Sequence, residues 1–306
     1  MMVLQQPLKS FFTFLSHNRT MNQLAKKWGL KLGASQVVAG TTIEEAIARV
    51  NDLNQKGLFC TLDHLGEFVN SRQEAIEATD YCIRTLEQIA QTGVNCNLSL
   101  KLTQLGLGID DRFCLENMQR IMKTASSLDI FVRIDMEDYS HCQQTLDILA
   151  ELRKTYSNIG TVIQAYLYRA EEDVQALAGV PLRLVKGAYK ESANVAMQQK
   201  KDIDENFFSL IKLHLSSGAY TAIATHDHRI IERVKKYTKE NKIPCSQFEF
   251  QMLYGFRVNL QEELVKEGYQ MRVYVPFGID WFGYFMRRLA ERPQNVAFAL
   301  RGFFSK

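Results

Sequence analysis

Two adjacent arginines, Arg287 and Arg288, are the clearest candidates for binding chemistry in the sequence. Their guanidinium groups offer a fork of N–H donors, and a planar carboxylate fits such a fork through two parallel hydrogen bonds. A helical pattern begins near Asp280. It places Tyr284, the arginine pair and Glu291 on one face of a helix that is otherwise mostly apolar. We therefore predict that this charged face lines a cavity; a solvated face with charge pairs four residues apart is the alternative interpretation.

Polar or ionisable side chains also follow eight short apolar or alternating runs earlier in the chain. In a barrel of parallel strands these positions meet at one mouth, where the loops after the strands build the active site. Polar side chains at all eight strand ends in succession are not expected from the general polarity of loops alone. The side chains are Asp63, Lys101, Asp135, Gln164, Lys186, Thr225 with His226, Gln251 and Tyr274.

The run at 182–186 carries two basic residues, Arg183 and Lys186, on opposite sides of the predicted strand. We expect one of them to point into the barrel and the other outward. Gly187 follows, and a glycine lets a ligand approach the backbone closely. Thr225 and His226 supply a hydroxyl, an imidazole and backbone N–H groups before a predicted helix, which suits either a phosphate or a helix cap.

The elements that must position these side chains alternate between strand and helix from residue 57 onward. This alternation indicates parallel pairing with right-handed crossovers. Eight units favour an α/β fold, a (β/α)8 TIM-like barrel, over a doubly wound sheet, and no GxGxxG follows an early strand. The predicted strands are 58–62, 96–100, 130–134, 161–167, 182–185, 220–224, 246–250 and 272–275, and the helices between them are 73–90, 115–128, 142–153, 171–177, 204–215, 230–238 and 260–267.

The first part of the chain is predicted to be a helical arm. Its last helix, 42–53, has Thr41 or Thr42 as a plausible N-cap, with Glu44 and Glu45 in the first turn. We expect two parts: a short helical N-terminal arm at 1–55 and a catalytic (β/α)8 barrel at 56–306.

The composition excludes several classes of protein. The 306 residues carry 37 Lys and Arg against 34 Asp and Glu, and a net charge of +3 is too small to indicate nucleic-acid binding. Six scattered cysteines without a CxxC pair fit a reduced compartment. No apolar run approaches the ~18 residues of a membrane span. We therefore expect a cytoplasmic protein.

Two other enzyme classes remain open at this point. A Schiff-base (class I) aldolase would use Lys101 or Lys186 as its nucleophile, but it leaves the arginine pair without a role. The run His226-Asp227-His228 resembles part of a metallohydrolase site. Zinc catalysis usually needs three protein ligands, however, and only six histidines are present, so we predict no metal. An interaction module without a cofactor would not need so many ionisable groups at one mouth.

Four segments together are similar to the flavin-dependent proline dehydrogenases of the monofunctional bacterial type. They are RLVKGAY at 183–189, FQMLYG at 250–255, RVYVPFG at 272–278 and YFMRRL at 284–289. The matches recur in order over the whole predicted barrel. The resemblance implies a barrel that binds FAD non-covalently and oxidises L-proline to Δ1-pyrroline-5-carboxylate, the first step of proline degradation to glutamate.

The resemblance also implies roles for individual residues. The proline carboxylate would bind Arg287, Arg288 and Lys101, with Glu291 orienting the arginine pair. Asp135 and Arg183 would be the catalytic residues, with Arg183 against the reactive edge of the flavin. The pyrrolidine ring would lie among Tyr274, Tyr284, Tyr189 and Leu253, and the flavin would contact Met136, Gln164, Lys186, Gly187, Ala188, Thr225, His226 and Gln251 as well as Arg183.

Two positions depart from the family pattern. Lys190 replaces a frequent Trp, and Asp227 replaces a frequent Asn, which puts FAD affinity in doubt more than the chemistry. The family also implies that electrons pass to a quinone-type acceptor in the membrane. Contact with the inner face of a bilayer through 11–15 or 296–304 would be peripheral, and barrel packing of these apolar segments is the favoured interpretation.

Overall fold

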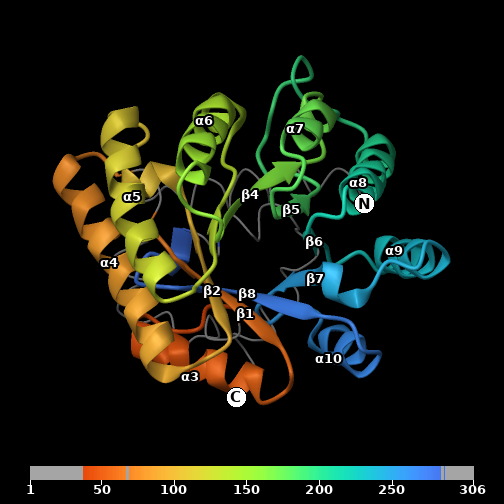
Figure 1. Ribbon diagram of the computed structural model, residues 1–306, viewed down its shortest axis with the longest axis horizontal. Coiled ribbons are helices and arrows are strands. Elements are labelled where there is room, and N and C mark those ends of the chain that lie inside the picture. The colour runs from red at the N-terminus through yellow and green to blue at the C-terminus, as the bar shows by residue number, and fades with distance from the viewer. Residues whose placement is uncertain (1–36, 67–68, 284–285, 287–306) are drawn as a thin grey trace.

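The computed structural model describes residues 37–66, 69–283 and 286, and it confirms the (β/α)8 barrel. The strands β1 to β8 form a closed barrel in sequence order, and every neighbouring pair is parallel. Helices surround the strands (Figure 1). The strands are β1 Phe59–His64, β2 Cys96–Leu100, β3 Val132–Ile134, β4 Ile159–Gln164, β5 Leu182–Val185, β6 Thr221–Ala224, β7 Phe248–Leu253 and β8 Met271–Phe277.

The helices follow the strands in the alternation predicted from the sequence. Two of the strands, β2 and β5, and the helix α6 have the bounds that the hydrophobic pattern predicted. The described α-helices are α3 Ile43–Asn54, α4 Arg72–Thr92, α5 Asp111–Ser127, α6 Cys142–Arg153, α7 Ala170–Ala176, α8 Lys200–Ser216, α9 His228–Glu240 and α10 Val258–Lys266, with 3-10 turns η4 Leu102–Leu105, η5 Tyr139–His141 and η6 Cys245–Gln247.

The helix α3 packs on the outside of the barrel where β8 pairs with β1. Thr42 is its N-cap, and the Thr42 hydroxyl accepts a hydrogen bond from the backbone N–H of Glu45, as the sequence predicted. Its buried residues, which include Ile43 and Val50, face β1 and β8, the two strands that close the sheet. The rest of the predicted arm, 1–36, lies outside the described residues.

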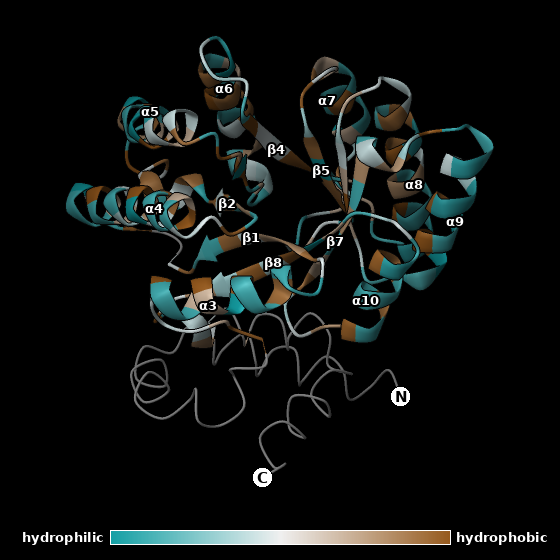
Figure 2. Cartoon of the chain, turned by 60° about the horizontal axis from the view of Figure 1, so that its bottom comes forward, coloured by the Kyte–Doolittle hydropathy of each residue, from teal (hydrophilic) through white to brown (hydrophobic). Residues whose placement is uncertain are grey.

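One continuous apolar layer fills the space between the strands and the helices. Residues such as Phe207 on α8 and Leu86 on α4 are fully buried in it. Figure 2 shows the complementary pattern, with hydrophilic residues along the outer sides of α4 and α9. This layer holds the barrel together by apolar burial, which leaves the interior of the barrel available for polar side chains.

The strands β7 and β8 extend farther than the sequence predicted. Pro276 was expected to follow the end of β8, but it lies inside the strand. Pairing with β7 ends earlier, at Leu253 and Tyr274, while pairing with β1 continues to Phe277. The carbonyl of Pro276 accepts a hydrogen bond from the backbone N–H of Ala39 at 2.9 Å. The missing N–H of proline therefore costs the strand no bond to β7.

Gly160 on β4 provides a test of how closely β4 packs against β5. A Cβ atom at this position would lie 2.1 Å from the carbonyl oxygen of Pro181 and 2.8 Å from Nη1 of Arg133. We expect Gly160→Ala to lower the free energy of unfolding by about 2–3 kcal/mol, since overpacking a tight site costs that order. Gly108→Ala is the control, because nothing lies within 4 Å of its added Cβ. Urea unfolding measures both, and equal midpoints would contradict the close β4–β5 packing.

Candidate active site

Polar and charged side chains from several strands and strand ends meet inside the barrel around Arg183. Arg183 is buried, with 5% of the residue exposed. Nη1 donates to Oδ1 of Asp135 at 2.6 Å, Nη2 to the hydroxyl of Ser99 at 3.0 Å, and Nε to Oε1 of Gln251 at 2.6 Å. Its carbon Cζ lies 5.2 Å from the centre of the Tyr274 ring. Of Arg183 on β5 and Lys186 directly after it, Arg183 is therefore the one that points inward.

Lys101 and Asp63 complete this cluster on the side of β1 and β2. Nζ of Lys101 donates to Oδ2 of Asp63 at 2.9 Å and lies 3.5 Å from Oδ2 of Asp135. The hydroxyl of Tyr274 lies 2.7 Å from Oδ2 of Asp63 and 2.8 Å from Oδ2 of Asp135. One phenol thus contacts two carboxyl groups, and it has only one proton to donate.

The surroundings shift the pKa values of these two carboxyl groups in opposite directions. Burial opposes ionisation of Asp135, but the charges of Arg183 and Lys101 outweigh it and lower the pKa. At Asp63 burial prevails over the attraction of Lys101, and the nearby Asp135 adds to the rise of the pKa. Burial and both carboxyl groups raise the pKa of the Tyr274 phenol. Asp135 therefore holds its negative charge more firmly than Asp63 does.

A second group of charges lies where β5 and β6 end. Nζ of Lys186 contacts Oδ1 of Asp204 at 2.5 Å and Oδ2 of Asp227 at 2.8 Å. Lys200 is ion-paired with the same two aspartates. Asp227 is also the N-cap of α9, and its Oδ1 accepts from the backbone N–H of Arg229. A lysine at a helix N-terminus suits a phosphate, but here two carboxylates compete for its N–H groups.

Thr225 and His226 both have partners within the protein. The Thr225 hydroxyl accepts from the backbone N–H of Asp227 at 3.1 Å, so Thr225 contributes to the helix cap that was the alternative interpretation. Nε2 of His226 accepts from the backbone N–H of Leu253 at 3.0 Å. The neutral His226 ring then carries its proton on Nδ1, the nitrogen that can donate.

The remaining predicted cofactor residues line the same end of the barrel. Gln164 is buried and donates to the carbonyl of Glu137 at 2.8 Å, and Met136 packs in a small apolar cluster with Tyr166. Gly187 has φ +114°, and a Cβ there would lie 2.2 Å from the Tyr166 ring, so only glycine fits. Ala188 is exposed, whereas Tyr189 and Leu253 are half-buried.

Several residues of this cluster were not assigned a role from the sequence. The signal for them was the two-residue period within the strands, which puts Ser99 with Lys101 and Glu249 with Gln251 on one face. Arg272 shares a face with Tyr274 in the same way. The period indicates that these side chains point inward, but it does not indicate which partners they meet.

The predicted carboxylate-binding helix is described only at its start. Residues 281–283 and 286 are helical, in agreement with a helix that begins near Asp280. The residues Tyr284, Arg287, Arg288 and Glu291 lie outside the described residues, so their predicted roles stay predictions.

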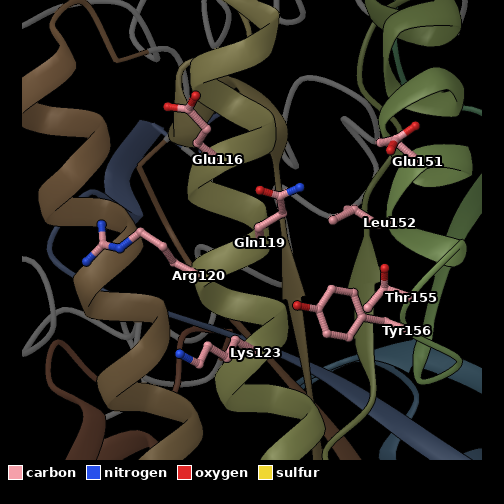
Figure 3. A pocket seen from close by; sticks show the side chains of 8 residues that line it. All are labelled: Glu116, Gln119, Arg120, Lys123, Glu151, Leu152, Thr155 and Tyr156. Carbon is pink, nitrogen blue, oxygen red and sulfur yellow. The ribbon is translucent and has the colours of Figure 1, made fainter.

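A groove on the outer ring of helices is a separate feature (Figure 3). It lies between α5 and α6, close to the end of α6 that precedes β4, and so on the side of the barrel opposite the strand ends. Three of its charged side chains have partners: Arg120 pairs with Asp80, Glu116 with Arg112, and Glu151 with Lys154. Its lining residues are Glu116, Gln119, Arg120, Lys123, Glu151, Leu152, Thr155 and Tyr156.

No group of three or more His, Cys, Asp or Glu side chains among the described residues could hold a metal ion. None of the helices described here combines the length and the apolar character needed to span a bilayer.

Comparison with known proteins connects this geometry to a family. The proline dehydrogenase family model matches residues 46–301. The chain is 52% identical to proline dehydrogenase 1 of Bacillus subtilis strain 168 over 301 residues, which is 98% of this chain and 100% of that protein. It is 42% identical to the proline dehydrogenase of Deinococcus radiodurans, with 92% of this chain and 93% of that protein covered.

Solved structures agree with the sequence matches. Proline utilization A of Bdellovibrio bacteriovorus, inactivated by N-propargylglycine, superposes with a TM-score of 0.81 at 28% identity. The match covers 92% of this chain but 34% of that polypeptide, so this chain corresponds to about a third of it. A Bradyrhizobium japonicum proline utilization A variant, at 22% identity and a TM-score of 0.72, shares the fold. By sequence and by barrel architecture, the chain belongs to the proline dehydrogenase family.

Proposed function

We propose that this protein is an FAD-dependent proline dehydrogenase that oxidises L-proline to Δ1-pyrroline-5-carboxylate. The observation that carries the proposal is the buried Arg183–Asp135 pair at the barrel mouth, with Lys101 and Tyr274 beside it, in a chain of this family. FAD would supply the hydride acceptor, a chemistry that side chains lack. The protein would supply position, charge and exclusion of water.

The cationic groups have separate tasks in this proposal. Arg183 would lie against the reactive edge of the flavin, where its charge stabilises negative charge on the reduced ring. Asp135 holds the guanidinium in place. Lys101 would bind the proline carboxylate together with Arg287 and Arg288, and these cations disfavour the ammonium form of proline, which must lose its proton before hydride leaves C5.

The remaining assignments follow the resemblance, and the donor set supports them. Arg183 offers N–H groups at the mouth, and Lys186 offers an ammonium group for the phosphates. Glu291 would orient the arginine pair. The proposed flavin contacts are Met136, Gln164, Arg183, Lys186, Gly187, Ala188, Thr225, His226 and Gln251, and the proposed ring contacts of proline are Tyr189, Leu253, Tyr274 and Tyr284.

The acceptor and the location are proposals of the same kind. Electrons would pass to a quinone-type acceptor, with the protein in the cytoplasm; peripheral contact with the inner face of the membrane is the alternative to packing of the apolar segments on the barrel. The proposed catalytic unit is the barrel at 56–306, preceded by the arm at 1–55. The aldolase alternative has no support, because Lys101 and Lys186 are both ion-paired, whereas Schiff-base formation requires a neutral amine.

The direct test is an anaerobic titration. Purified protein should show flavin absorption in the visible range, and L-proline should bleach it because the ring is reduced. D-proline is the control, since its carboxylate cannot reach the same cations with C5 in place. A colourless protein that traps a carbonyl substrate with borohydride would instead favour the aldolase.

Variants of the cationic residues should separate catalysis from binding. Arg183→Ala should lower kcat by about a hundredfold, the order seen when a preorganised charge stabiliser is removed. Arg287→Ala or Arg288→Ala should raise the KM for proline by about tenfold or more with a smaller effect on kcat, because a charged hydrogen bond to the carboxylate is lost. Steady-state assays with a dye acceptor measure both constants, and an unchanged KM in both arginine variants would remove the carboxylate role.

Asp227→Asn should tighten FAD binding by about threefold, because Lys186 loses one of two competing carboxylates in a partly exposed ion pair. Stability should not change, since Asn caps a helix as well as Asp. Glu205→Gln is the matched control, as it removes a carboxylate paired with Arg233 on the same surface of α8 and α9. Fluorescence titration of the apoprotein with FAD gives the affinities; equal values for wild type and Asp227→Asn would contradict competition at Lys186.

A further inference from the structure

Glu249 is a fully buried carboxylate, 1% exposed, that lies below the proposed flavin site. Its Oε2 accepts from the Tyr220 hydroxyl at 2.8 Å, and both of its oxygens lie within 3.0 Å of Nε of Arg272. Its Oε1 accepts from the side-chain NH2 of Gln251 at 2.5 Å. Burial opposes ionisation of Glu249, but Arg272 outweighs it and lowers the pKa of the carboxyl group. An ionised carboxylate only accepts hydrogen bonds.

The contact with Gln251 determines which way this amide faces. Because its NH2 group donates to Glu249, its oxygen must face Arg183, whose Nε donates to it at 2.6 Å. A reversed amide would place NH2 against Nε, two donors in contact. Glu249 and Gln251 lie two residues apart on β7 and share its inward face, so the chain Glu249–Gln251–Arg183 runs directly along the interior of the barrel.

We propose that Glu249 is a positioning residue for the flavin-reducing centre: it fixes the orientation of the Gln251 amide, which holds Nε of Arg183 and so aims the guanidinium. The inference rests on the proposed FAD-dependent function. Nη1 and Nη2 of Arg183 are held by Asp135 and Ser99. The hydrogen bond from Nε to Gln251 holds the third nitrogen of the guanidinium. The orientation of the guanidinium plane therefore depends on Glu249, through Gln251.

A structural role for the buried ion pair with Arg272 has to be separated from positioning. Replacing one member of such a pair leaves an unpaired buried charge, whereas replacing both with apolar residues of similar volume is often neutral for stability. The double variant Glu249→Met with Arg272→Met therefore keeps the fold and the net charge, but it removes the acceptor for the Gln251 NH2. Glu249→Gln leaves Arg272 without its counterion and so should lower the urea midpoint, but it can keep a carbonyl oxygen facing Gln251 while its NH2 faces the Tyr220 hydroxyl.

We expect the double variant to unfold near the wild-type urea midpoint but to be reduced by L-proline about tenfold more slowly, the effect of losing one properly placed hydrogen bond to a charged group. Glu249→Gln should restore most of that rate. Tyr220→Phe removes the hydroxyl contacts to Oε2 of Glu249 and to Gln270 but leaves Oε1 of Glu249 on Gln251, so it should leave the rate unchanged. Anaerobic single-turnover experiments measure the rate of flavin reduction. The midpoint potential of the bound flavin is measured in the same variants.

A second measurement does not depend on the cofactor. In the 15N-labelled apoprotein, the Nε–H signal of Arg183, assigned with Arg183→Lys, should exchange with solvent faster in the double variant than in wild type or in Glu249→Gln. If the double variant has the wild-type rates of flavin reduction and of Nε–H exchange, Glu249 acts only on stability. If only Glu249→Gln is reduced slowly, the charge of Glu249 causes the effect. Either result would overturn the proposal that Glu249 positions Arg183. If proline fails to bleach the wild-type protein, the proposed function fails, while the exchange experiment still tests the positioning.

Discussion

The ion pair between Arg183 and Asp135 constrains the rest of the structure. Both side chains are nearly inaccessible to water, and a buried charge is tolerated only when it is paired and its other hydrogen-bonding groups are satisfied. Ser99 and Gln251 each accept a hydrogen bond from a further N–H group of Arg183. These four residues come from or directly follow β2, β3, β5 and β7, and a slip of one residue in any of these strands would turn its side chain outward. The polar interior therefore specifies the register of the barrel.

Most of the architecture follows from local pattern. Eight apolar runs alternating with amphipathic segments leave few topologies other than a parallel barrel, and the structure has that topology. A local cue also predicted the start of α3 as Thr41 or Thr42, and it is the Thr42 hydroxyl that caps the helix. The end of β8 was predicted wrongly. A proline usually ends a strand, and the strand was therefore predicted to stop before Pro276. The sequence does not reveal that pairing with β7 has already ended there.

The contacts within the site could not be predicted in the same way. Alternation showed that one of Arg183 and Lys186 points inward, but it could not decide which. The partners lie far apart in the chain: 68 residues separate Arg183 from Gln251, and 211 separate Asp63 from Tyr274. Which of them meet depends on the closure of the barrel, a global property. The pairing of Lys186 with two aspartates has the same origin, and no local pattern indicates it.

The cluster around Tyr274 illustrates how one barrel mouth can give two carboxyl groups different properties. The phenol lies within hydrogen-bonding distance of both Asp63 and Asp135 but can donate to only one of them. Asp135 faces Arg183, which favours its ionised form, whereas Asp63 is wholly buried and has a raised pKa. Environments that push two pKa values apart separate a fixed charge from a group that can hold a proton. Asp135 is thus the charged counterion of Arg183, whereas the surroundings of Asp63 favour its protonated form more than those of Asp135 do.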